Sequence, residues 1–305
     1  MSKEEPLDLD YQKVRRELVT LFEATANKLE REWPTRYTHV DSARVLFYQS
    51  VRIAINTYNT ILWICADTPK DPDRKPVYAL SLAPLTRTLF EQLVMLLFLL
   101  EDVPQYIQLL FKTGYAARRA ELGHVLKYHG SLPDWQDYID ALRRQIAVEE
   151  REVRLTQAEI QHPESTIGKW PTPGKVLKRL RRDHPASPNI NFIEYLDSWM
   201  YRELSEQTHL EAQGLTQRGM FFSPDISRRL FGDDWETVMD AHLERYRVKQ
   251  VFTAIALMLA ICSEIEVHFK YGLNQRVRYL WTFFRPSSGI IKDFWETKYS
   301  AFIPE

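Results

Sequence analysis

Apolar residues recur at three- and four-residue spacing along most of this chain, and runs that alternate apolar and polar residues are few. That spacing gathers apolar side chains on one face of a helix, whereas a half-buried strand requires alternation. The chain also holds only 10 glycines in 305 residues, so positions that break a helix are sparse. We therefore predict an all-α protein, a multi-helix bundle of roughly eight to ten helices with no significant β-sheet.

Prolines and short polar stretches divide the chain into predicted helices. These helices cover approximately residues 10–32, 41–66, 84–101, 104–128, a charged helix from 133 onward, 192–209 and 235–271. Pro84 is expected in the first turn of its helix, where a missing N–H costs nothing. Residues 162–191 hold five prolines and two glycines around one short basic helix. This segment is the predicted functional loop or subdomain boundary.

Three regions follow from this division of the chain. Residues 1–77 are predicted to form an N-terminal helical pair that packs on the core, and residues 78–271 a central helical bundle that carries the candidate motif. Residues 272–305 form a tail rich in aromatic side chains. The tail is too apolar to be disordered, and we expect it to pack onto the body of the protein or onto a second subunit.

Charge and cysteine content restrict the partners. Lys+Arg 40 against Asp+Glu 41 gives a formal net charge of -1, so nucleic-acid binding would have to come from a local basic patch. Cys65 and Cys262 both lie in apolar helical runs, where a free thiol behaves as a small hydrophobe. We expect no disulfides and a reducing, cytoplasmic location.

Targeting and membrane signals are weak in this sequence. The first residues, MSKEEPLDLD, lack the apolar core of a signal peptide. The two most apolar runs, 89–100 and 251–262, are shorter than the roughly 20 residues that a membrane span needs. We therefore interpret both runs as core helices and predict no membrane partner.

Residues 201–209, YRELSEQTH, place several chemically active side chains on one predicted helix. At about 100° per residue, Arg202 and His209 lie within about 20° of one face and roughly 10 Å apart along the axis. A guanidinium can hold a phosphate while an imidazole moves protons near neutral pH. RNA supplies its own nucleophile, the 2′-hydroxyl, so this pair needs no metal, and Ser205 and Glu206 could orient it. The structural alternative is that Arg202 pairs with Glu206 and His209 caps the helix end.

An arginine, a short helical spacer and a histidine resemble the signature of the HEPN superfamily, the higher eukaryotes and prokaryotes nucleotide-binding domains. Many HEPN proteins are metal-independent ribonucleases that form their site across a dimer, and toxins and antiphage effectors are common among them. The resemblance implies a cofactor-free homodimeric ribonuclease with Arg202 on the phosphate and His209 as acid or base. Two features depart from the pattern: Glu203 follows the arginine, where asparagine, aspartate or histidine is usual, and a long stretch of chain follows the motif.

Longer blocks of sequence resemble a bacterial all-helical domain family of unknown function. They are LTRTLFEQLVMLLFLLED at 85–102, GYAARRAEL at 114–122, GKWPTPGKV at 168–176, and Tyr195 through the form Y-x-x-L-S-x-x-x-H at 201–209. This resemblance implies no reaction. It implies a helical bundle with a shared cavity, faced by Arg87, Glu91, Tyr201, Ser205 and His209. In a non-enzymatic scaffold or sensor, such a cavity would hold a small anion or a buried polar network.

A di-metal carboxylate site is another interpretation of the same histidine. Glu121 with His124 and Glu206 with His209 are both Glu-x-x-His pairs, the i,i+3 arrangement by which ferritin-like bundles present metal ligands. Glu91 is the candidate for a further carboxylate from a neighbouring helix. By contrast, Glu264 and His268 lie beside other charged residues, and we predict that they belong to a solvated helix face.

Residues 175–184, KVLKRLRRDH, form a predicted basic amphipathic helix next to Trp170. Its cations are Lys175, Lys178, Arg179, Arg181 and Arg182. Such a helix can grip a phosphate backbone while the tryptophan stacks a base, which makes RNA the predicted partner. The alternative is a solvated helix that its aliphatic side chains anchor to the protein.

Several widespread catalytic motifs are missing from the sequence. It has no Walker-type phosphate loop, no G-x-G-x-x-G after a strand, no G-x-S-x-G, no H-E-x-x-H and no paired C-x-x-C. These absences exclude nucleotide kinases, Rossmann oxidoreductases, α/β hydrolases and zinc fingers from the candidates.

Overall fold

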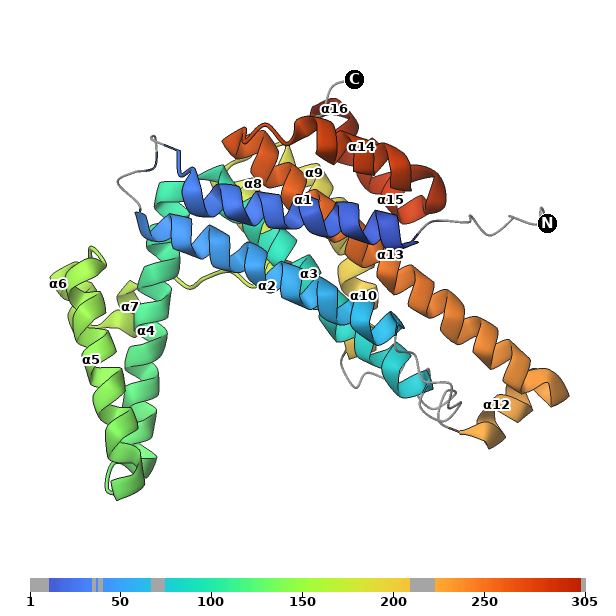
Figure 1. Cartoon of the computed structure of the whole chain (residues 1–305). Coiled ribbons are helices and arrows are strands. Elements are labelled where there is room, and N and C mark those ends of the chain that lie inside the picture. The colour runs from blue at the N-terminus through green and yellow to red at the C-terminus, as the bar shows by residue number, and fades with distance from the viewer. Residues whose placement is uncertain (1–10, 35–36, 38–40, 67–74, 209–222, 303–305) are drawn as a thin grey trace. The chain divides into compact units, whose positions relative to one another are not determined.

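The computed structural model describes residues 11–34, 37, 41–66, 75–208 and 223–302. Every regular element among them is a helix, and none of these residues lies in a strand (Figure 1). The all-α prediction is therefore confirmed. The chain separates into two compact units: residues 98–179 form one, and the segments before and after them form the other. The predicted boundaries follow residues 77 and 271, whereas this division follows residues 97 and 179.

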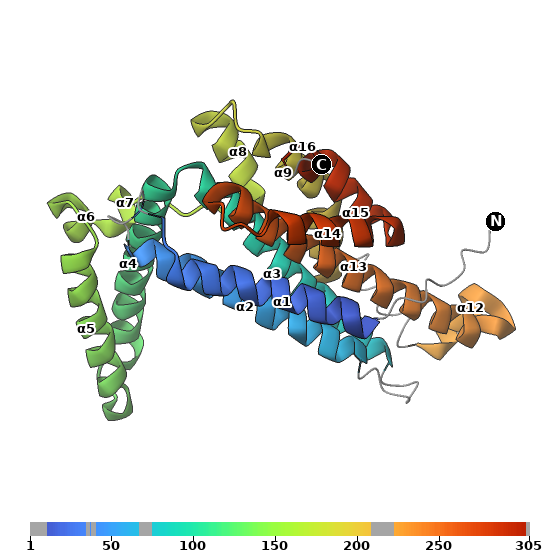
Figure 2. The same cartoon turned by 45° about the horizontal axis from the view of Figure 1, so that its top comes forward.

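The larger unit is built around one long central helix. Its elements are α1 (Tyr11–Arg31), α2 (Asp41–Ala66), most of α3 (Lys75–Glu101), the end of α8 (Pro173–Asp183), α9 (Asn189–Leu196), α10 (Arg202–Thr208), α12 (Pro224–Phe231), α13 (Trp235–Phe269), α14 (Asn274–Phe284), α15 (Gly289–Phe294) and α16 (Ser300–Phe302). Helix α13 packs against α1, α2, α12, α14 and α15, and these helices lie beside it in both views (Figure 2). Almost every residue between Val251 and Glu266 is buried, as expected for a helix that is apolar on all sides.

The aromatic tail belongs to this unit. Helices α14 and α15 both pack on α13, and Trp281, Phe284, Phe294 and Tyr299 are at most 2% exposed. The prediction that the tail packs onto the body is confirmed. A π-helical turn (η6, Trp295–Tyr299) joins α15 to α16.

One predicted helix start was wrong. Helix α3 begins at Lys75, and Pro84 lies inside it rather than in its first turn. Pro76 takes the first-turn position instead, where a proline is well tolerated. Pro84 removes one N–H from the interior of the helix. Its own carbonyl accepts the hydroxyl of Thr88 at 3.0 Å.

Two helical stretches, Ser81–Glu101 and Pro224–Phe269, are long and apolar enough to cross a membrane by length and composition. The uninterrupted apolar runs 89–100 and 251–262 are shorter than these stretches, because each helix extends beyond its apolar run. The most apolar windows are 61% and 78% buried inside the protein. Core helices of soluble proteins have the same length and hydropathy.

The smaller unit is a helical hairpin followed by two short helices. Helix α4 (Val103–His129) lies beside α5 (Gln136–Glu152), and α6 (Gln157–Gln161) and α7 (Pro163–Thr166) follow. The side chain of Asp102 caps α4 by accepting the N–H of Gln105 at 3.1 Å. The buried core of this unit includes Tyr115, Ile146 and Ile167.

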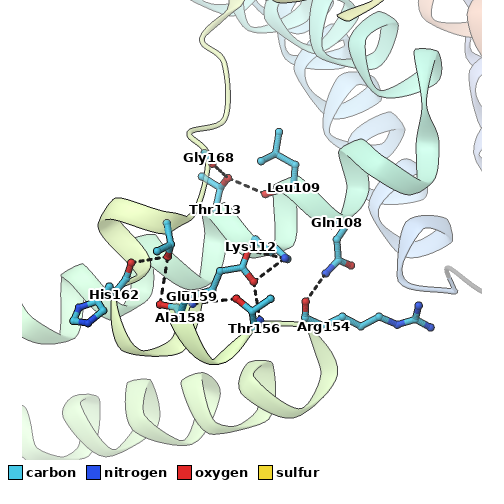
Figure 3. Close-up of polar contacts among 11 residues, drawn as sticks. Gln108, Leu109, Lys112, Thr113, Arg154, Thr156, Ala158, Glu159, His162 and Gly168 are labelled. Carbon is cyan, nitrogen blue, oxygen red and sulfur yellow. Dashed lines mark hydrogen bonds and ion pairs between the residues drawn. The ribbon is translucent and has the colours of Figure 1, made fainter.

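Polar contacts fasten α6 to α4 in this unit (Figure 3). Lys112 donates to both carboxylate oxygens of Glu159, at 2.6 and 2.8 Å. Glu159 also closes a capping box with Thr156 at the start of α6. Burial opposes ionisation of Glu159, but the hydrogen bonds from Lys112 and Thr156 outweigh it and lower the pKa of the carboxyl group. We interpret this cluster as a structural contact between α6 and α4, because its charged groups are paired with each other.

Candidate functional site

The candidate motif begins at a change of helix type. A π-helical turn (η3, Asp197–Tyr201) separates α9 from α10, so the predicted continuous helix is interrupted immediately before Arg202. One extra residue in a turn rotates the following side chains by about 100° relative to an uninterrupted α-helix. Such turns occur frequently at functional sites. The interruption sets which way the motif helix faces, and periodicity counted from α9 would place its side chains wrongly.

Three of the predicted cavity residues come together beside this turn. The Arg87 Nε atom donates to the Glu91 Oε1 atom at 2.9 Å, one turn along α3. The guanidinium carbon of Arg87 lies 5.6 Å from the centre of the Tyr201 ring, and this ring packs at 5.7 Å from that of Phe90. Arg87, Phe90, Glu91 and Tyr201 thus form a cluster between α3 and the motif segment, which we name the Tyr201 cluster. Because Glu91 partly neutralises Arg87, the cluster attracts an anion less strongly than an unpaired arginine would.

Arg202 lies on the solvent side of α10, between anchored neighbours. Its side chain is exposed, whereas Tyr201 belongs to the Tyr201 cluster and Leu204 is buried. Glu203 accepts two hydrogen bonds from the Lys249 ammonium on α13, at 2.5 and 2.7 Å. The residue that departs from the HEPN pattern therefore ties α10 to the central helix.

The second half of the motif is described in part. Helix α10 is α-helical through Thr208, and Ser205 is half-buried one turn after Tyr201. For Glu206 the structure describes the helical backbone but not the side chain, and His209 lies outside the described residues. The predicted alignment of Arg202 with His209 therefore stays a prediction.

The basic helix is observed as α8, and its aliphatic face is buried. Val176 and Leu180 are each 0% exposed, and Lys175 and Lys178 are exposed on the opposite side. Neither lysine forms an ion pair with any residue that the structure describes. They are the two cations of α8 best placed to meet a phosphate backbone.

The arginines of α8 are engaged within the protein. Arg181 pairs with Glu194 at 2.8 Å, and Arg182 contacts both carboxylate oxygens of the neighbouring Asp183, at 2.6 and 3.1 Å. Arg179 donates to the backbone carbonyl of Lys169 at 3.2 Å. The two carboxylate pairs reduce the positive charge that α8 presents to a partner, whereas Arg179 keeps its charge but has one N–H engaged.

Arg179 and Trp170 both contact the ring of Phe98 in the smaller unit. The guanidinium carbon of Arg179 lies 5.6 Å from the centre of the Phe98 ring and 5.8 Å from that of Tyr106. The Trp170 and Phe98 rings meet edge to face, with centres 5.4 Å apart and planes 72° apart. The Trp170 ring therefore already packs against Phe98, and a nucleic-acid base would have to stack on the part of the ring that this contact leaves uncovered.

The structure does not assemble the di-metal alternative within the residues that it describes. No group of three or more histidine, cysteine, aspartate or glutamate side chains gathers there to hold a metal ion. Glu121 accepts a hydrogen bond from the Tyr138 hydroxyl, and the His124 ring lies 4.6 Å from that of Tyr128. The remaining candidates, Glu206 and His209, carry no described side chains, so this ligand set is not tested.

The prediction that Glu264 and His268 form a solvated face was wrong. Glu264 is 7% exposed and accepts hydrogen bonds from Lys298 at 2.6 Å and from the Tyr299 hydroxyl at 2.8 Å. His268 lies 2.8 Å from the hydroxyl of Tyr37. Lys298 and Tyr299 of the tail cover Glu264 on α13. The charges next to Glu264 in the sequence do not predict this contact, because Lys298 lies far along the chain.

The two thiols are unsuited to nucleophilic chemistry. Both cysteines are free and buried. Burial raises the pKa of Cys262 to about 12 and that of Cys65 to about 11. A thiolate is the reactive form, so neither residue is a catalytic nucleophile at neutral pH.

Comparison with known proteins adds no family assignment. No protein-family model matches this sequence, and neither a curated protein nor a solved structure matches it. Function is therefore argued from the residues and their arrangement.

Proposed function

We propose that this chain is a metal-independent, HEPN-like ribonuclease in which Arg202 holds the scissile phosphate and His209 transfers the proton. The observation that supports this most is the setting of Arg202. Its side chain is exposed at the start of α10, while Tyr201 and Glu203 on either side are held by α3 and α13. A charged group on an anchored backbone is the arrangement that phosphate recognition requires.

The reaction would use the substrate's own hydroxyl group. The RNA 2′-oxygen attacks the adjacent phosphorus as its proton leaves to a base, and the bond to the 5′-oxygen breaks as that oxygen receives a proton. His209 serves as the base or the acid, and Arg202 stabilises the charge on the non-bridging oxygens. Ser205 and Glu206 would orient these two groups.

Lys175 and Lys178 are the proposed contacts to the RNA backbone outside the reacting phosphate. Both are exposed, and each would release counterions as it neutralises a phosphate. A homodimer would supply a second motif, as the HEPN resemblance implies. In cells we expect a toxin or antiphage effector whose toxicity His209→Ala relieves.

The decisive experiment measures cleavage of a labelled single-stranded RNA by purified protein in the presence of a chelator. His209→Ala is expected to lower the rate by about 10²–10⁴-fold, the usual contribution of general acid–base catalysis. Arg202→Lys should also lose activity, because an ammonium lacks the paired donors of a guanidinium. The matched control is Arg143→Ala, which removes an exposed arginine from the other unit. Intact RNA with the wild-type protein, or equal cleavage by all variants, would reject the proposal.

The Tyr201 cluster favours a second candidate function, a non-enzymatic scaffold or sensor. The Arg87–Glu91 pair and its contact with Tyr201 are the internal polar network that this alternative predicts. Under this alternative RNA stays intact, and inorganic phosphate raises the melting temperature of the wild-type protein but not of Arg87→Met.

A further inference from the structure

The carboxylate of Glu266 is buried, and no charged residue in the described part of the chain forms an ion pair with it. This residue is 1% exposed, and its Oε1 atom accepts the N–H of Gly272 at 3.0 Å. The Oε2 atom has no hydrogen-bond partner, and Glu266 forms no ion pair with any residue in the described ranges. Buried carboxylates are normally paired or bound to a cation, so this one requires an explanation.

A second buried oxygen is the hydroxyl of Tyr271, five residues after Glu266. Tyr271 is 9% exposed, and its hydroxyl group has no hydrogen-bond partner among the residues that the structure describes. Burial raises the pKa of Tyr271, and the charges of Glu32 and Glu266 raise it further. Tyr271 directly precedes Gly272, whose N–H donates to the Glu266 carboxylate, so the turn after α13 brings Tyr271 and this carboxylate into one region.

Aromatic rings surround this end of α13. The Phe269 ring stacks on that of Tyr271, with centres 5.7 Å apart and planes 19° from parallel. Trp33 meets Phe269 at 5.6 Å, and Tyr37 meets it at 6.2 Å. The faces of aromatic rings carry partial negative charge and attract cations. These rings pack on Phe269, three residues after Glu266 on the same helix.

The turn after α13 leads from this region to solvent. Lys270 adopts a left-handed conformation with φ 59°, and Gly272 has φ 81°. Gly272 is exposed, and an added Cβ atom there would have no neighbour within 4 Å. The residue that binds the Glu266 carboxylate through its N–H is thus itself open to solvent. Lys270 is the left-handed residue that ends α13, and its N–H donates to the backbone carbonyl of Glu266 at 2.8 Å.

We propose that Glu266, Tyr271 and the rings beside them bind a small cation with N–H donors, a primary ammonium or a guanidinium group. The carboxylate supplies the charge, and the two unpaired oxygens require donors. The aromatic faces favour a flat or weakly hydrated cation. This α13-end site shares no residue with the Arg202 motif, so the inference stands or falls independently of the ribonuclease proposal.

The test is isothermal titration of the full-length protein with agmatine, which carries both a guanidinium and an ammonium group. Wild-type protein is expected to bind it saturably, with affinity at least tenfold weaker in Glu266→Gln and several-fold weaker in Tyr271→Phe. Choline carries the charge without N–H donors and should bind more weakly than agmatine. The matched control is Glu236→Gln, the same substitution at an exposed position of the same helix, which should leave affinity unchanged.

Three results would overturn the inference: no binding by wild-type protein, equal affinity in Glu266→Gln and wild type, or choline binding as tightly as agmatine. Melting temperatures without ligand provide an independent check. Glu266→Gln should raise the melting temperature, because it removes an unpaired buried charge, and a lower value would show that the charge is already compensated. If Glu266→Gln does not fold, Tyr271→Phe decides the question, since it keeps the ring and removes one of the two oxygens.

Discussion

Replacing Lys298 with methionine tests how the tail is held on the central helix. The Lys298 Nζ atom lies 2.6 Å from Glu264 Oε1 and 2.5 Å from Asn189 Oδ1, and its side chain is 5% exposed. It also packs over the rings of Phe192 and Tyr299, at 5.1 and 5.7 Å. The substitution keeps most of the side-chain volume but leaves Glu264 as a buried carboxylate whose remaining described hydrogen bond comes from a phenol.

The expected loss is large for a single substitution. Removing one partner of a buried ion pair costs about 3–5 kcal/mol, because the other charge stays buried and unpaired. At about 2.1 cal/mol/K of unfolding entropy per residue, each kcal/mol corresponds to about 1.6 °C in melting temperature for a chain of 305 residues, so a fall of about 5–8 °C is expected. Urea unfolding followed by circular dichroism should show the same loss as a lower midpoint with an unchanged slope.

Two further variants separate this explanation from a general intolerance of substitution. Lys292→Met, at an exposed position of α15, should change stability by less than about 0.5 kcal/mol. The double variant Glu264→Leu/Lys298→Met should recover most of the loss, since apolar replacements of both partners are often neutral or stabilising. A loss below about 1 kcal/mol for Lys298→Met, or no recovery in the double variant, would refute the reasoning.

Three other predictions follow from the surface and from the buried thiols. If Lys175 and Lys178 contact RNA phosphates, replacing both with alanine should flatten the slope of log affinity against log salt by about 1.4, measured by fluorescence anisotropy; an unchanged slope contradicts the contact. The pKa of Glu159 is lowered on folding, so its stabilisation is present above the ordinary value of 4.5 and is lost as the pH falls through the lower folded value. Urea midpoints measured from pH 7 downward should therefore fall less steeply for Glu159→Gln than for wild type, and parallel curves would exclude this contribution. Cys65 and Cys262 should react with a thiol reagent at pH 8 only after denaturant is added, and rapid labelling of the native protein would contradict their burial.

Helices were predictable from sequence where the signals are local. Residues 41–66 were predicted from periodicity and a breaker-rich end, and α2 has those bounds. The start of α3 was mispredicted because Pro76 and Pro84 both suit a first turn, and sequence does not rank them. The π-helical turns at Asp197–Tyr201 and Trp295–Tyr299 have no sequence signature of comparable strength.

The polar pairs that define the sites were harder to predict. Arg87 and Glu91 lie one turn apart on a single helix, so i,i+4 spacing is enough to predict their ion pair. Lys249 reaches Glu203, and Lys298 reaches Glu264, from segments far along the chain. Such pairs depend on how helices pack, and a single sequence carries no direct record of that packing.

The most direct test of the proposed ribonuclease identifies the ends of the RNA products made in the presence of a chelator. Attack by the 2′-hydroxyl must leave a 2′,3′-cyclic phosphate on one fragment and a 5′-hydroxyl on the other, and His209→Ala should form neither. Products with 3′-hydroxyl and 5′-phosphate ends, cleavage that stops when metal is removed, or full activity in His209→Ala would contradict the proposed use of Arg202 and His209.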